Sequence, residues 1–279
     1  MRAALLALAL VCAASPAAAQ SVAVAADAPS ARVAFAERRA LLAADDSCRY
    51  FTPQVRVALE AGALQARNAL IRAGWTRPRL VELETAAISA ARARDCADPR
   101  TRAAADRARA GFSGWARTPS MTFTGGARSW IARRAPDEDG WRLMQVAGGG
   151  ARFGMRNDEV VLSTPLPAGQ APPSSAQLVV RDVARARDSL FEIPGRRASG
   201  LQAGVASPAA SRSFLPRARR IEADAHGSRR LFLVFPNDVL AAMAPLDPRE
   251  VADIRMDNGA RILVEVGDLA AARAFLAAR

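Results

Sequence analysis

The stretch that decides the fold is residues 48–96, CRYFTPQVRVALEAGALQARNALIRAGWTRPRLVELETAAISAARARDC, which has a cysteine at each end. Thr52 and Pro53 are typical of a helix start, because threonine is a good N-cap and proline at the first helical position loses no needed N–H group. Gly74 favours a helix end, so we expect the first helix to stop at the preceding residue. Residues 76–78, Thr-Arg-Pro, begin a second helix after a turn so short that this helix must return antiparallel to the first.

The antiparallel return brings the two cysteines together. A helix rises 1.5 Å per residue, so the two predicted helices are each about 30 Å long and their outer ends lie at the same end of the hairpin. Cys48 and Cys96 occupy those outer ends. The sequence therefore predicts a disulfide between Cys48 and Cys96, with two unrelated buried thiols as the alternative.

The N-terminus has the pattern of a secretory signal peptide. Arg2 precedes an apolar run over about residues 3–14, and three alanines follow at positions 17–19. We expect residues 1–19 to be a signal peptide that is cleaved after Ala19. The apolar run is short for a permanent membrane anchor, and no later segment is long and apolar enough to cross a bilayer. The sequence therefore predicts a periplasmic or secreted protein with no transmembrane segment after cleavage.

Cysteine usage agrees with this location. Cleavage removes Cys12 and leaves Cys48 and Cys96, an even pair, as expected for a structural disulfide in an oxidising compartment. Lipoprotein processing at Cys12 is disfavoured, because Val11 stands where that cleavage requires a small residue. We expect residues 20–30 to form a flexible lead into the folded part.

The pattern of apolar residues changes once along the chain. Residues 31–111 read as four amphipathic helices, the first of them over about 31–44 with Ser30 as its N-cap. Residues 112–120 are expected to be a linker. Residues 121–279 read as short alternating strands. The predicted fold class is therefore α+β, a disulfide-linked helical domain followed by a mainly antiparallel α+β domain that ends in a hairpin and a C-terminal helix.

The C-terminal part carries the clearest local signals. Asn258-Gly259 between two alternating runs predicts a tight hairpin, since both residues tolerate the positive φ of that turn. Asn237 is expected to cap a short helix, Asp268 to cap the last helix, and residues 195–216 to form a long loop. The predicted strands are 121–123, 127–133, 141–146, 151–155, 159–163, 177–183, 220–223, 230–235, 252–256 and 260–266.

The composition restricts the chemistry that the protein can perform. The chain has one histidine and, after cleavage, no cysteine outside the predicted disulfide, so we expect neither a metal site nor a cofactor. The most suggestive polar group is Glu222, Asp224 and His226, whose alternate positions share one face of a strand. The alternative is that they are the solvent side of a hairpin tip. They are the only weak candidates for acid–base catalysis.

The formal net charge of +12 comes entirely from arginine, because the chain has no lysine. GC-rich codons also produce Arg-rich and Ala-rich proteins, so part of this charge can be codon bias. Arginines crowd the stretch 193–221, which has no acidic residue, and a loop of this kind suits an anionic surface. Aromatic residues do not alternate with these arginines as they do in base-stacking sites, so we do not expect nucleic acid as a partner. The candidate anion-binding residues are Arg196, Arg197, Arg212, Arg217, Arg219 and Arg220.

Three functional hypotheses follow for this chain, which has the look of an exported bacterial protein. The first is a non-enzymatic interaction module that contacts a cell-envelope component, either a protein, an anionic polymer or a lipid surface. The second is an envelope hydrolase that uses carboxylates near His226. The third is a binder of anionic ligands that acts through the Arg-rich 193–221 loop. A concave site with converging carboxylates would favour the enzyme, whereas a filled core would favour the module.

Overall fold

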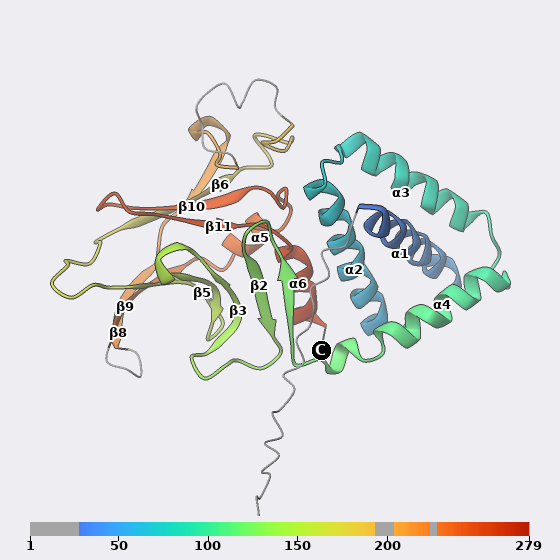
Figure 1. The fold of residues 1–279 in the computed structure, drawn as a ribbon, viewed down its shortest axis with the longest axis horizontal. Helices are drawn as coiled ribbons and strands as arrows, with labels where there is room; N and C mark the ends of the chain where they lie inside the picture. Colours follow the sequence, from blue (N-terminus) through green and yellow to red (C-terminus); the bar gives the residue numbers. More distant parts are fainter. Residues whose placement is uncertain (1–27, 193–203, 224–227, 279) are drawn as a thin grey trace, which may run out of the picture.

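The computed structural model describes residues 28–192, 204–223 and 228–278 of the chain. Figure 1 shows helices α1 to α4 on one side of the molecule and two β-sheets on the other, with helix α6 between α2 and strands β1 and β2. This arrangement confirms the predicted α+β fold with a helical N-terminal part. Of the helices in the described ranges, none is long and apolar enough to span a bilayer.

The four N-terminal helices follow the predicted start signals closely. Thr52 accepts a hydrogen bond from the N–H of Val55, and Asp98 accepts one from Thr101, so both side chains cap as expected. Proline stands in the first turn of three of these helices. The helices are α1 (Ala28–Cys48), α2 (Pro53–Arg72), α3 (Arg77–Arg92) and α4 (Pro99–Phe112).

Helix α1 is longer at both ends than the predicted 31–44. It begins at Ala28, so Ser30 lies inside the helix and is not its N-cap. It continues through Asp45, whose buried carboxylate accepts hydrogen bonds from the Phe51 N–H at 2.8 Å and from Arg56 at 2.7 Å. Partners from the following loop and from α2 therefore hold Asp45 inside the C-terminal part of the helix.

The predicted disulfide is confirmed. Cys48 and Cys96 are bonded, and their Cα atoms lie 5.5 Å apart. The bond joins the end of α1 to the loop after α3, at the far end of the hairpin from the Gly74 turn. That turn has the expected left-handed glycine, with φ of +87°.

The strands form two antiparallel sheets. One has the order β1-β2-β3-β4-β5-β9-β8 and the other β11-β10-β6-β7. The predicted Asn258-Gly259 hairpin joins β10 to β11, and Gly259 has φ of +83°. The strands are β1 (Ser120–Thr124), β2 (Ser129–Arg133), β3 (Trp141–Val146), β4 (Arg152–Arg156), β5 (Glu159–Pro165), β6 (Ala176–Arg181), β7 (Ser211–Phe214), β8 (Ala218–Ala223), β9 (Arg229–Phe235), β10 (Val251–Met256) and β11 (Arg261–Glu265).

Two local predictions in this part were wrong. The stretch 195–216 is not a single loop, since β7 lies within it and pairs with β6. Only Phe214 of β7 is buried, so this edge strand lacks the apolar alternation by which strands are recognised. The short helix α5 (Val239–Met243) begins after Asp238 without a side-chain cap, so Asn237 is not its cap.

Helix α6 (Leu269–Ala277) joins the helical part to the sheets. Phe275 is fully buried, and its ring lies 5.2 Å from that of Trp115, which follows α4. Asp268 precedes the helix as predicted, but its carboxylate bonds to Arg72 of α2 at 2.9 Å instead of capping α6. Helix α2 therefore packs on α6 as well as on α1 and α4, as its wide apolar face indicates.

Candidate functional site

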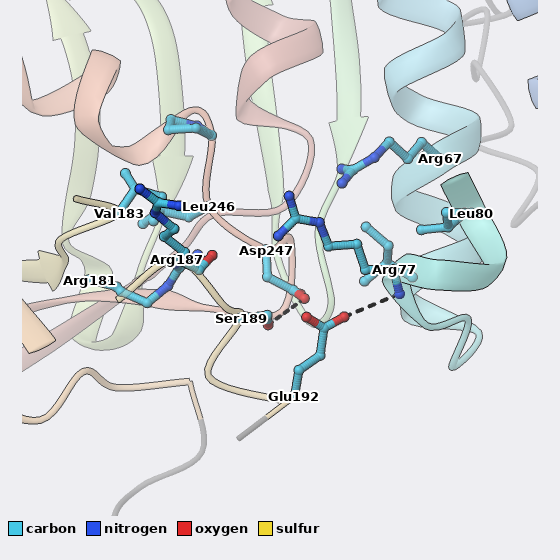
Figure 2. A pocket seen from close by; sticks show the side chains of 12 residues that line it. Arg67, Arg77, Leu80, Arg181, Val183, Arg187, Ser189, Glu192, Leu246 and Asp247 are labelled. Carbon is cyan, nitrogen blue, oxygen red and sulfur yellow. Dashed lines mark hydrogen bonds between the residues drawn. The ribbon is translucent and has the colours of Figure 1, made fainter. Parts of the chain in front are cut away.

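The candidate site is a pocket of about 210 Å³ at the Gly74 end of the helical hairpin. Its wall comes from α2 and α3, from the segment 181–192 that follows β6, and from residues 245–247 after α5. Figure 2 shows Arg67 and Arg77 on the helical side of the pocket and Arg181 and Arg187 on the opposite side. Four guanidinium groups thus line one small space, together with Ser189, Glu192 and Asp247.

Arg67 is a half-buried charge of the pocket. It lies on α2 next to the buried Ile71, and α3 contributes the buried Leu80 beside it. No hydrogen bond or ion pair in the described part of the chain reaches its guanidinium. Burial lowers the pKa of Arg67, the carboxylates of Asp247, Glu84 and Glu192 counteract this from a distance, and the nearby Arg77 lowers it further. A half-buried cation that lacks a direct partner is suited to receive an anion.

Arg77 is the first residue of α3, and its side chain is 62% exposed. The nearest carboxylate oxygen to its guanidinium is that of Asp188, at 4.0 Å, the outer limit of an ion pair. Its backbone N–H donates to Glu192 at 3.2 Å, as the dashed line in Figure 2 shows. The Glu192 carboxylate therefore binds at the start of α3, where the free N–H groups of a helix favour a negative charge.

A buried ion pair holds the far wall of the pocket in place. Arg181 donates to both carboxylate oxygens of Glu250 at 3.0 Å, and both side chains are almost fully buried. Glu250 also accepts the N–H of Leu190 at 3.1 Å, while Arg181 donates to the carbonyl of Ala186. Burial raises the pKa of Glu250, and Arg181 opposes this. These bonds fix the segment that presents Arg187 to the pocket.

The second acidic group of the pocket, Asp247, has its negative charge balanced by an arginine. Asp247 accepts from Ser189 Oγ at 2.7 Å and from two nitrogens of the Arg249 side chain at 2.9 and 2.7 Å. Burial alone would raise the pKa of Asp247, but these hydrogen bonds outweigh it and lower the pKa below its usual 3.8. Arg249 and Ser189 thus hold the Asp247 carboxylate in place at the wall of the pocket.

Those residues singled out in the sequence that the structure describes do not line this pocket. Glu222 lies on β8 at the edge of the larger sheet, 3.1 Å from Arg156 and 4.0 Å from Arg220. Asp224 and His226 lie outside the described residues. The hypothesis of a hydrolase near His226 therefore stays a prediction.

Three of the predicted anion-binding arginines have carboxylate partners. Arg212 bonds to Asp238 at 2.7 Å, and both Arg217 and Arg220 pair with Glu159 of β5. Arg219, on β8, has no such partner among the described residues. The remaining two candidates, Arg196 and Arg197, lie outside the described residues.

The position of Arg67 in the sequence is unusual, and this could have indicated that its side chain is not simply solvated. Arg67 stands four residues after Ala63 and four before Ile71, in the middle of the apolar stripe of its helix. Arginines on these helices are expected to be solvated faces, whereas a cation inside such a stripe must lie against a neighbouring part of the fold. Arg187 carries no comparable signal, because it is one of several polar residues in an irregular segment.

The described residues contain no group of three or more His, Cys, Asp or Glu side chains that could hold a metal ion. Arginines lie on two sides of the pocket, and their guanidinium groups are chemically suited to anionic groups. Comparison with known proteins adds no function to this geometry: no family model, no curated protein and no solved structure matches the chain.

Proposed function

We propose that the protein is exported and acts as a non-enzymatic interaction module that binds an anionic group of a cell-envelope component. The pocket between the helical hairpin and the 181–192 segment is the proposed binding site. The observation that carries this proposal is the Arg67 guanidinium, which faces the pocket beside Arg77 and has no direct partner among the described residues. Arginine forks suit phosphate and carboxylate groups, so a phosphate on a lipid or polymer is the expected form of the ligand.

The charges around the pocket support an anion more than a cation or a neutral ligand. Asp247 is compensated by Arg249, and Arg181 is compensated by Glu250. Glu192 is engaged with the start of α3. Among the described residues, Arg67 and Arg187 have no carboxylate partner and Arg77 has one only at 4.0 Å, so the pocket is positive overall.

Export is proposed from the signal-peptide pattern of residues 1–19. The Cys48–Cys96 disulfide is compatible with an oxidising compartment outside the cytoplasm. In that compartment the available polyanions are lipid headgroups and envelope polymers.

The test uses protein isolated from the envelope fraction and phosphatidylcholine vesicles with or without phosphatidic acid. Wild type should be retained on the vesicles that carry phosphatidic acid, and inorganic phosphate should compete for the site. R67Q should weaken retention about tenfold or more, since a hydrogen bond to a charged group contributes about 1.5–3 kcal/mol. Added salt should reduce the difference between wild type and R67Q only in part, because the site is half-buried.

R92Q is the matched control. Arg92 is the exposed last residue of α3, near the disulfide. R92Q removes the same formal charge as R67Q. Equal losses of retention for R67Q and R92Q, or no preference of wild type for the anionic vesicles, would overturn the proposal that the pocket is the binding site. Mass spectrometry of the same preparation should find an N-terminus at Gln20, and an intact Met1 in a cytoplasmic fraction would contradict export.

A further inference from the structure

A second cavity, of about 220 Å³, lies within the helical part between α1, α2 and α4. Five of its eight lining residues are apolar, namely Leu41, Leu59, Ala104, Ala108 and Phe112. Leu41 and Leu59 belong to the core of these three helices and are almost fully buried. The cavity therefore has an apolar side next to three charged residues, Glu37, Arg38 and Arg107.

Arg38 of α1 is a polar group of this cavity that lacks a counterion among the described residues. Its Nη1 donates to the carbonyl of Gly62 on α2 at 2.5 Å, and its guanidinium lies 5.9 Å from the centroid of the Phe112 ring. In the described part of the chain no carboxylate forms an ion pair with it. Burial lowers the pKa of Arg38, and Glu37 opposes this only through its field.

The residue beneath Arg38 leaves room for the guanidinium. A Cβ atom at position 62 would come within 3.1 Å of Arg38 Cζ, so glycine at this position lets the arginine lie against the α2 backbone. At the mouth of the cavity Arg107 and Glu37 face each other at 3.7 Å, and both are largely exposed. This exposed pair is weak and can open without a large loss of stability.

An unpaired charge in an apolar wall is unfavourable unless something compensates it. Buried charges in folded proteins are normally paired, and a methionine at position 38 would fill the same space without this penalty. A guanidinium fork with free N–H groups is shaped to bind a carboxylate. The hydrophobic wall beside it can bury the apolar body of the same molecule.

We propose that this cavity binds a small amphipathic carboxylic acid, with its carboxylate on Arg38 and its apolar body against Leu41, Leu59 and Phe112. The size of the cavity agrees with such a ligand, since an apolar cavity of about 150 Å³ accommodates benzene. The site does not depend on the arginine pocket at the other end of the hairpin, so either site can exist without the other.

The test measures binding of hexanoate, hexanol and acetate to the mature protein by calorimetry and by the shift in Tm. Hexanol has the chain without the charge, and acetate has the charge without the chain. Wild type should bind hexanoate at least tenfold more tightly than either of them. Equal binding of hexanoate and hexanol would overturn the proposal.

Two variants separate the two halves of the site. R38M should abolish the preference for hexanoate over hexanol while keeping or raising the Tm of the free protein, whereas a merely structural Arg38 would give a lower Tm. A108L should fill the cavity and weaken hexanoate and hexanol alike, with Arg38 in place. R100M is the control, because Arg100 is an exposed residue of the neighbouring helix α4. A hexanoate preference that survives R38M, or hexanoate binding unchanged by A108L, would contradict the site.

Discussion

The β8 edge of the larger sheet and the pocket end of the helical hairpin are both rich in arginine, but their charges are compensated differently. At the β8 edge, Arg217 and Arg220 share the carboxylate of Glu159. At the hairpin, Arg67 has no direct partner among the described residues, and Arg77 has only a carboxylate at 4.0 Å. At the β8 edge two neighbouring arginines thus share one carboxylate and Arg219 has none among the described residues, whereas the pocket brings together arginines from distant segments.

This difference shows that a run of arginines is a poor measure of local charge. A strand presents its side chains to the neighbouring strands, so antiparallel pairing readily supplies carboxylates to a basic edge. The pocket gathers cations from α2, α3 and the 181–192 segment, and no regular pairing opposes them. A test of the comparison must therefore change one region and measure both.

The largest effect should come from breaking the Cys48–Cys96 bond, which ties the hairpin at the end away from the pocket. Closing a loop with a sequence separation of 48 stabilises a fold by about 4 kcal/mol in the chain-entropy model. The double variant C48S/C96S should lose about that much free energy of unfolding in urea. Hydrogen exchange should then show faster opening in α1 to α3 than in the sheet strands. Equal acceleration in both regions would mean that they do not differ in local stability.

A smaller effect should follow from removing the compensated carboxylate of the pocket. D247N leaves Arg249 and Ser189 without their ionised acceptor and should lower the free energy of unfolding by about 2 kcal/mol at pH 7. The variant also removes a negative charge near Arg67, so it should be retained on phosphatidic acid vesicles more strongly than wild type. The stability change should depend on pH.

The direction of that dependence follows from the lowered pKa of Asp247. A carboxyl whose folded pKa lies below its unfolded value stabilises the protein above the unfolded pKa, and this stability is lost as the pH falls through the folded pKa. The gap between wild type and D247N should therefore be complete at pH 7 and shrink below about pH 4. Urea unfolding at several pH values measures it, and a gap that widened with acid would contradict the ionised Asp247.

Most of the fold could be predicted from the sequence because its signals are local. Thr52-Pro53, Gly74 and Asn258-Gly259 each act within a few residues, and the disulfide follows from two helices of similar length. The predicted C-terminal end of α1 was wrong because Asp45 obtains its partners from Phe51 and Arg56, which lie beyond the range of local sequence signals.

The candidate site could not be predicted, because its parts come from distant segments. Arg67 and Asp247 line the same pocket although 180 positions separate them in the chain. The compensation of the β8 edge is equally non-local, since Arg217 and Arg220 lie 58 and 61 positions from Glu159. Sequence patterning finds where charges are, but only the fold decides which of them meet.

The smallest effect on stability should come from the sharpest test of the comparison, the variant E159Q. Glu159 is 31% exposed and its two arginine partners are nearly half exposed, so the pairs contribute only about 0–1 kcal/mol. The Tm should change little. Arg217 and Arg220 should, however, lose their carboxylate partner. The variant should then be retained on anionic vesicles through the β8 edge as well as through the pocket, and wild type lacks this second contribution.

Two combinations decide what that gain means. In E159Q combined with R67Q, the new retention should persist, because it comes from the β8 edge and not from the pocket. In E159Q combined with R217Q and R220Q, the added retention should disappear, so that only the retention due to the pocket is left. High salt should remove the gain almost completely, since exposed charges are strongly screened. If E159Q binds anionic vesicles no better than wild type, the carboxylate is not what keeps the β8 edge inactive, and the contrast between the two regions fails.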